Sequence, residues 1–118
     1  MKEDKDNIIR SKSFDFALLI IELYRQMLEE KEYVLSKQLL RSGTSIGANI
    51  EEASAAISRK DFIAKMSISA KEARETLYWL KLINKSKIVK TDVSELLEKS
   101  DELIRILTSI VKTSQSST

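Results

Sequence analysis

The scarcity of backbone-breaking residues constrains this chain more than any other feature. Among its 118 residues there is no proline, and the only two glycines are Gly43 and Gly47. All-β folds and doubly wound α/β folds need more turn residues than this, so the sequence predicts a helical protein. The length and the 42% content of hydrophobic residues suit one folded domain with a single core.

Four amphipathic stretches follow one another, separated by short polar breaks. Apolar residues recur at helical spacing over residues 13–29, 33–57, 58–84 and 92–112. Ser58 and Asp61 have the S-x-x-D spacing of a capping box, which predicts a helix start there. No repeat or linker divides the chain, so we predict an all-α protein with a single domain over residues 1–118. Residues 1–12 and 113–118 are expected to be frayed tails.

The stretch 13–29 carries more apolar surface than a helix of a monomeric bundle needs. Its polar residues cover only about a third of the circumference at 100° per residue. We therefore expect this helix to contact a second subunit. The residues assigned to that contact are Phe16, Ile20, Leu23 and Met27.

The third stretch repeats this signal on a second face. Ile68, Trp79 and Leu82 form an apolar line away from the stripe expected to face the core. An exposed tryptophan among aliphatic residues is typical of a partner contact, so these three are also assigned to a subunit interface. The alternative is that Trp79 covers the end of a neighbouring helix or the link 88–89.

The two glycines lie one helical turn apart. Leu39, Ile46 and Ile50 stay in phase across them, which favours one continuous helix over a break between two short ones. Glycine inside a helix costs about 1 kcal/mol relative to alanine. Close packing of another helix at Gly43 and Gly47 would compensate that cost.

Two segments of the chain resemble the sequence blocks of one family. Residues 38–53 read QLLRSGTSIGANIEEA, and residues 61–80 read DFIAKMSISAKEARETLYWL. They resemble the bacterial four-helix-bundle proteins encoded in intervening sequences of 23S ribosomal RNA genes. The accessory variability protein of diversity-generating retroelements is distantly similar. The glycines at 43 and 47 depart from the family pattern, in which alanine, serine or proline are frequent there.

This resemblance implies a fold more than a function. It implies an antiparallel up-down-up-down four-helix bundle and a homopentamer, as in characterised relatives. The retroelement protein binds nucleic acid and a reverse transcriptase, whereas the intervening-sequence proteins have no established biochemical activity.

The residues offer little for enzyme chemistry. Histidine and cysteine are absent, which excludes zinc fingers, thiol catalysis and serine–histidine machinery. Glu51 and Glu52 point about 100° apart on a helix, so they cannot act together. Glu72 and Glu75 share a face, but no nucleophile or phosphate loop accompanies them. We predict a non-enzymatic protein without a cofactor or a bound metal.

Local basic patches leave nucleic-acid binding open. The net charge is only +2, yet several basic residues cluster where acidic ones are absent. The residues assigned to RNA or DNA contact are Lys37, Arg41, Arg59, Lys60, Lys81, Lys85, Lys87 and Lys90. The alternative is that positive charge at the end of the third helix only stabilises that helix.

The remaining expectations concern partners and location. The longest apolar run, residues 16–21, is far too short to cross a bilayer, so we expect a cytoplasmic protein without a membrane partner. The expected partner is the chain itself, in a homo-oligomeric binding or assembly module. The alternative function is binding of RNA or DNA by basic patches that a cyclic oligomer would repeat.

Overall fold

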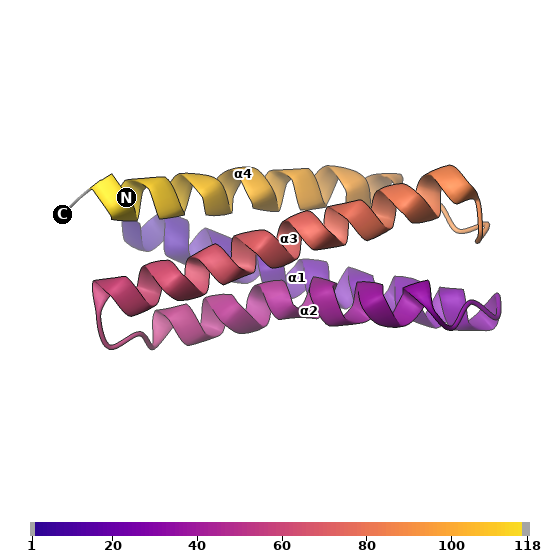
Figure 1. The fold of residues 1–118 in the computed structure, drawn as a ribbon, viewed down its shortest axis with the longest axis horizontal. Helices are drawn as coiled ribbons and strands as arrows, with labels where there is room; N and C mark the ends of the chain where they lie inside the picture. Colours follow the sequence, from indigo (N-terminus) through magenta and orange to yellow (C-terminus); the bar gives the residue numbers. More distant parts are fainter. Residues whose placement is uncertain (1, 117–118) are drawn as a thin grey trace.

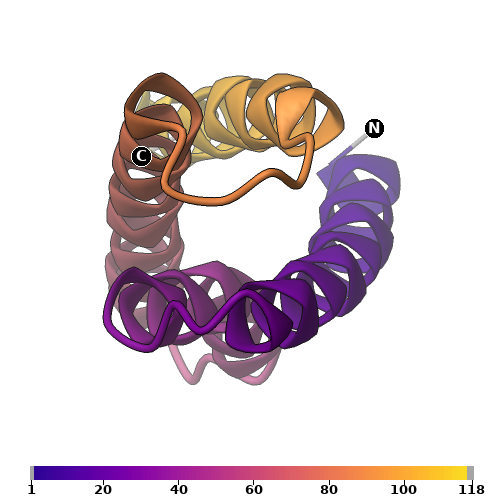
Figure 2. The same ribbon diagram turned by 90° about the vertical axis from the view of Figure 1, so that its right-hand side faces the viewer.

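The computed structural model describes residues 2–116, which form four long α-helices. These are α1 (Lys2–Glu29), α2 (Leu35–Ser54), α3 (Arg59–Ser86) and α4 (Ser94–Ser116). Consecutive helices run in opposite directions and are joined by short connections at alternating ends (Figure 1). Viewed from the end, α1 and α3 each pack against α2 and α4, so the helices form a four-cornered bundle (Figure 2). The predicted all-α four-helix fold is confirmed.

The outer helices are longer than the sequence predicts. α1 begins at Lys2 rather than near Ser13, and α4 continues to Ser116. This corrects the prediction of frayed tails for residues 2–12 and 113–116, whereas residues 1 and 117–118 lie outside the described part. The physical reason is visible at Ile9 and Ser13, which are buried and extend the core face of α1 by two turns.

The second helix is shorter than the sequence predicts. α2 ends at Ser54, and Ile57 lies in the connection to α3 with 95% of its surface exposed. Ser58 then caps α3, because its side chain accepts a 3.0 Å hydrogen bond from the backbone N–H of Asp61. The predicted start of the third helix is therefore confirmed.

One hydrophobic core fills the space between the four helices. It takes one apolar stripe from each helix, and the connection between α3 and α4 adds Val89 and Val93. Its largest fully buried side chains include Ile9, Phe16, Ile20, Met27, Leu39, Ile46, Met66, Leu80, Leu103 and Leu107. None of the helices in the described part of the chain is long and apolar enough to span a membrane.

Small hydroxyl side chains set the register between α2 and α3. The buried hydroxyls of Ser42 and Thr76 are hydrogen-bonded at 2.9 Å across the two helices. About one turn further along α2, Ser69 of α3 donates a 2.8 Å hydrogen bond to the backbone carbonyl of Ile46. Because buried polar groups are costly unless paired, these bonds favour a single alignment of the two helices.

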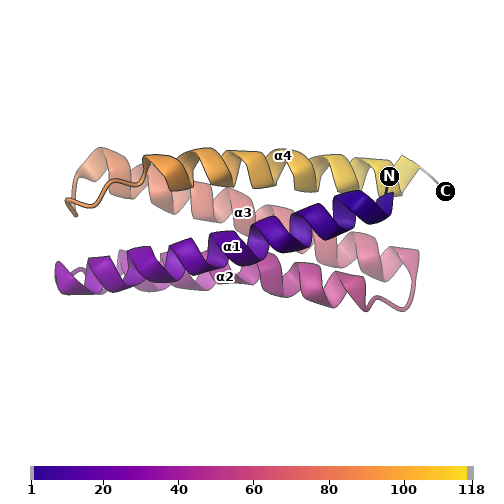
Figure 3. The ribbon, with the colours of Figure 1, turned by 180° about the vertical axis from the view of Figure 1, so that it is seen from behind.

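The α1 helix crosses the bundle at an angle to its neighbours. It starts beside the end of α4 and finishes beside α2, as the view from behind shows (Figure 3). The seam between α1 and α4 carries the ion pair of Lys12 with Glu102, at 3.1 Å.

Candidate interaction surfaces

The apolar residues of α1 assigned to a subunit interface lie inside the chain's own core. Phe16, Ile20, Leu23 and Met27 are each at most 2% exposed. The assignment of these four residues to a contact between subunits is therefore corrected. They fall on the same face as Ile9, and that face forms part of the hydrophobic core between α1 and its neighbours α2 and α4.

The exposed apolar surface of α1 is carried by other residues. Phe14 is 65% exposed and Leu18 is 52% exposed. Because they are four residues apart, they lie together on one face of the helix, away from the core. The expectation of excess apolar surface on this helix is confirmed, but the residues that provide it are different.

The predicted apolar line on α3 is partly exposed. Ile68 and Leu82 are 41% and 37% exposed, and both remain interface candidates. Trp79 is half-buried beside the core. The exposed ring of Tyr78 packs edge-on against it, with 5.4 Å between the two ring centroids. Trp79 thus packs within its own chain and still presents part of its surface.

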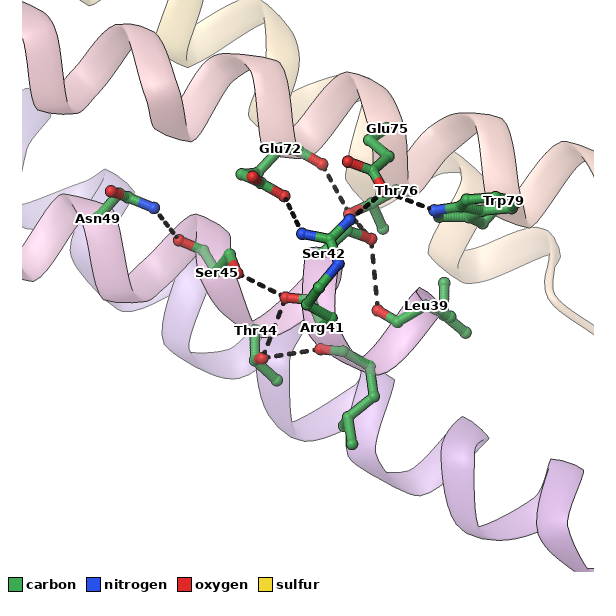
Figure 4. Close-up of polar contacts among 11 residues, drawn as sticks. Leu39, Arg41, Ser42, Thr44, Ser45, Asn49, Glu72, Glu75, Thr76 and Trp79 are labelled. Atoms are coloured by element: carbon green, nitrogen blue, oxygen red, sulfur yellow. Dashed lines mark hydrogen bonds and ion pairs between the residues drawn. The ribbon is translucent and has the colours of Figure 1, made fainter. Parts of the chain in front are cut away.

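Arg41 on α2 is held by carboxylates of α3, as the close-up shows (Figure 4). Its guanidinium donates to Glu72 at 3.3 Å and forms an ion pair with Glu75, which also accepts a 2.9 Å hydrogen bond from the indole N–H of Trp79. The hydrogen bond from Arg41, followed by that from Trp79, holds the pKa of Glu75 below its ordinary value. The hydrogen bond to Glu75 raises the pKa of Arg41. The carboxylate pair of Glu72 and Glu75 is therefore bound by a basic side chain.

The other glutamates considered for chemistry are also paired. Glu51 accepts from Arg10 of α1 at 3.1 Å, and Glu52 pairs with Lys65 of α3 at 2.8 Å. Within the described residues, no group of three potential metal ligands converges.

Both glycines face α1 at short range. A Cβ atom at Gly47 would lie 3.4 Å from the hydroxyl oxygen of Ser13, and one at Gly43 would overlap Ile20. The predicted close packing of another helix at these positions is confirmed, and α2 is continuous through both of them.

The structure divides the predicted nucleic-acid contacts between the two ends of the bundle. Arg59 and Lys60 begin α3 at one end. The other five lysines lie toward the opposite end, in the first turn of α2, the last turns of α3 and the α3–α4 connection: Lys37, Lys81, Lys85, Lys87 and Lys90. We call this opposite end, where the α1–α2 and α3–α4 connections meet, the loop end (Figure 1).

Three carboxylates at the loop end bind backbone N–H groups. Both oxygens of Glu32 accept from the start of α2, at 2.7 Å from Ser36 and 3.0 Å from Leu35. Asp92 accepts from the backbone N–H of Ser94 at 3.0 Å, near the predicted start of the fourth helix. Glu30 accepts from the α3–α4 connection. The sequence shows Glu30 and Glu32 only as part of a charged break, although an acidic residue shortly before a helix is a recognisable capping signal.

The pKa values of these carboxylates reflect their donors. Burial raises the pKa of Glu32, but the hydrogen bonds from the α2 backbone outweigh it and leave the pKa below 4.5. The backbone N–H of Lys90, followed by the hydroxyl of Thr91, lowers the pKa of Glu30. Each carboxylate is therefore held in its charged form by the backbone it fixes.

Comparison with known proteins shows which family has this sequence and fold. A family model described as 23S rRNA-intervening sequence protein matches residues 5–109. The chain belongs to this family. Among the solved structures that resemble this family member is a protein of unknown function from the S23 ribosomal protein family of Bacteroides thetaiotaomicron. It is 49% identical, with a TM-score of 0.87 over 92% of this chain and 98% of that chain.

The comparisons confirm the resemblance that the two sequence blocks indicate. For this intervening-sequence protein, a search of curated proteins finds no match. The family and the structural relative are of unknown function. Family membership therefore supports the fold and leaves the activity to be inferred from the surfaces described above.

Proposed function

We propose that this intervening-sequence protein is a non-enzymatic, homo-oligomeric binding or assembly module. The observation that carries the proposal is the exposure of Phe14 and Leu18 on α1, in a bundle whose core is already complete. Exposed apolar area costs about 25 cal/mol per Å², so covering it with another copy of the chain is favourable. By family resemblance, the proposed assembly is a ring of five.

The apolar face of α3 is the second part of the proposed contact. Ile68 and Leu82 flank the half-buried Trp79 on the outer side of this helix. Because α1 and α3 occupy opposite corners of the bundle, the two exposed faces belong to different sides of the molecule (Figure 2). Each copy can therefore use two separate surfaces for assembly.

Charge substitutions in the exposed faces test this proposal. We expect Leu18→Glu and Ile68→Glu to shift the sedimentation coefficient toward that of the monomer. Each substitution places a charge in a contact from which assembly would exclude water. Asn84→Glu is the matched control, since it puts the same charge at an exposed polar position of α3. An unchanged sedimentation coefficient in both test variants would contradict the proposed surfaces.

A second candidate function, binding of RNA or DNA, is favoured by the loop end. In the described part of the chain, Lys81, Lys85, Lys87 and Lys90 form no close ion pair with a carboxylate. Arg41, in contrast, is engaged by α3. A cyclic oligomer would repeat the lysines and multiply their attraction for phosphates. Retardation of labelled RNA or DNA that weakens as salt rises tests this candidate.

A further inference from the structure

The connection between α3 and α4 is fixed to α1 by a single carboxylate. One oxygen of Glu30 accepts a 2.7 Å hydrogen bond from the backbone N–H of Lys90. The other oxygen accepts a 2.8 Å hydrogen bond from the hydroxyl of Thr91. These contacts join the end of α1 to a connection some 60 residues later, so Glu30 fixes the position of one loop relative to the rest of the loop end.

The same connection is also held from its inner side. Val89 is 7% exposed and belongs to the hydrophobic core, whereas Lys87 and Lys90 on either side of it are exposed. Lys87 ends α3 in the left-handed conformation, with φ 54°. Val89 and Glu30 together therefore leave the lysine backbone little freedom while the ammonium groups stay in solvent.

We propose that Glu30 is a positioning residue for a phosphate-backbone binding site formed by Lys85, Lys87 and Lys90. This inference rests on the second candidate function, the binding of RNA or DNA. A loop that is already ordered loses less conformational entropy when it binds. Glu30 therefore strengthens binding through the position of the loop, although its negative charge alone opposes a polyanion.

Two substitutions at Glu30 separate its geometric role from its charge. Glu30→Gln and Glu30→Ala both remove one negative charge. The glutamine amide keeps an oxygen that can accept from Lys90 and an N–H₂ that can donate to Thr91, whereas alanine keeps neither. We expect Glu30→Gln to bind at least as tightly as the unmodified protein and Glu30→Ala to bind at least about threefold more weakly than Glu30→Gln.

The measurement is the fluorescence anisotropy of a labelled 20-nucleotide RNA and of a labelled DNA duplex of the same length, over a series of salt concentrations. Thr91→Val removes one hydrogen bond of the loop without a change of charge and is expected to weaken binding as well. Circular dichroism of each variant checks that helix content is unchanged.

A pair of double variants tests the location of the site. Lys85→Gln with Lys90→Gln removes two charges at the loop end. We expect the slope of the logarithm of the binding constant against the logarithm of salt concentration to become shallower, by the amount due to about two phosphate contacts. Lys71→Gln with Lys112→Gln removes two exposed charges outside the loop end and is the matched control. Equal effects of the two double variants would overturn the assignment of the site.

The outcomes distinguish this inference from the function on which it rests. If the unmodified protein binds neither polymer, RNA or DNA binding is wrong and the inference fails with it. If the protein binds but Glu30→Ala and Glu30→Gln have the same affinity, only the positioning role is wrong. Weaker binding by Glu30→Ala alone, with the loop-end double variant also weakened, supports the inference.

Discussion

Gly43 of α2 packs directly against the side chain of Ile20 of α1. A Cβ atom at Gly43 would lie 2.8 Å from Cγ1 and 2.9 Å from Cγ2 of this fully buried isoleucine. These γ carbons stand close to the α1 backbone, so they cannot move aside without shifting the helix. The absence of a side chain at Gly43 thus sets how closely α1 and α2 approach each other.

This contact predicts opposite effects for the same substitution at the two glycines. Gly43→Ala should lower the free energy of unfolding by about 1–2 kcal/mol, because overpacking of about 1–3 kcal/mol outweighs the gain in helix propensity. Gly47→Ala should be neutral or stabilise by up to about 1 kcal/mol, since its Cβ meets Ser13 at an ordinary 3.4 Å. Urea denaturation measures the free energy of unfolding of both variants. An increase in this free energy for Gly43→Ala would contradict the described packing.

The cap at the start of α2 predicts a second effect. Glu32→Ala removes the acceptor for the backbone N–H groups of Val34, Leu35 and Ser36, and should cost about 1 kcal/mol or more. Urea denaturation at neutral pH measures this loss. A cost close to zero would show that Glu32 does not cap the helix.

The lowered pKa of Glu32 gives this cap a defined pH dependence. A carboxyl with a folded-state pKa below its unfolded value contributes stability above pH 4.5, and the contribution is lost as the pH falls through the folded-state pKa. Unfolding measured between pH 5 and pH 2 should therefore show a smaller acid-induced loss of stability in Glu32→Gln than in the unmodified protein. Parallel pH profiles would contradict the lowered pKa.

The end of α1 predicts a stabilising substitution. Lys31 has φ 65°, and the backbone N–H of Glu32 donates to the carbonyl of Met27 at 2.9 Å, as in a Schellman motif. Glycine adopts this left-handed conformation without a steric cost, so Lys31→Gly should raise the free energy of unfolding by about 0.5–1 kcal/mol. Lys71→Gly, at an exposed position in the interior of α3, is the control and should cost about 1 kcal/mol. Thermal melts compare the two, and equal destabilisation would contradict the motif.

The repeating apolar pattern made much of the fold predictable. Leu39, Ile46 and Ile50 kept their phase across both glycines, and α2 is indeed continuous there. Ser58 and Asp61 correctly marked the start of α3. In both cases the signal is local, because it depends only on residues within a few turns of one helix.

The orientation of α1 could not be predicted in the same way. Nearly every face of this helix carries apolar residues, so composition alone does not show which face is covered. Ser13 stands at the predicted start of this helix, yet it is buried inside α1 and its hydroxyl donates to the carbonyl of Arg10. The sequence predicts a helix that starts only at residue 13, so Ile9 is not part of it. Ile9 therefore could not serve as a marker that Phe16 and Ile20 lie on the buried face.

The sequence alone also could not predict the long-range polar contacts at the candidate surfaces. Arg41 pairs with Glu72 and Glu75 more than 30 residues away. Glu30 binds a connection about twice as far along the chain. Such contacts depend on the register between helices, which buried pairs such as Ser42 with Thr76 fix only in the folded bundle.

The mass of the purified protein in solution tests the proposed assembly most directly. Light scattering at micromolar concentration should give a mass several times that of the 13.5 kDa chain, and five times that mass for a ring of five. A constant mass of 13.5 kDa across the concentration range would contradict the proposal that copies of this chain cover the exposed faces of α1 and α3.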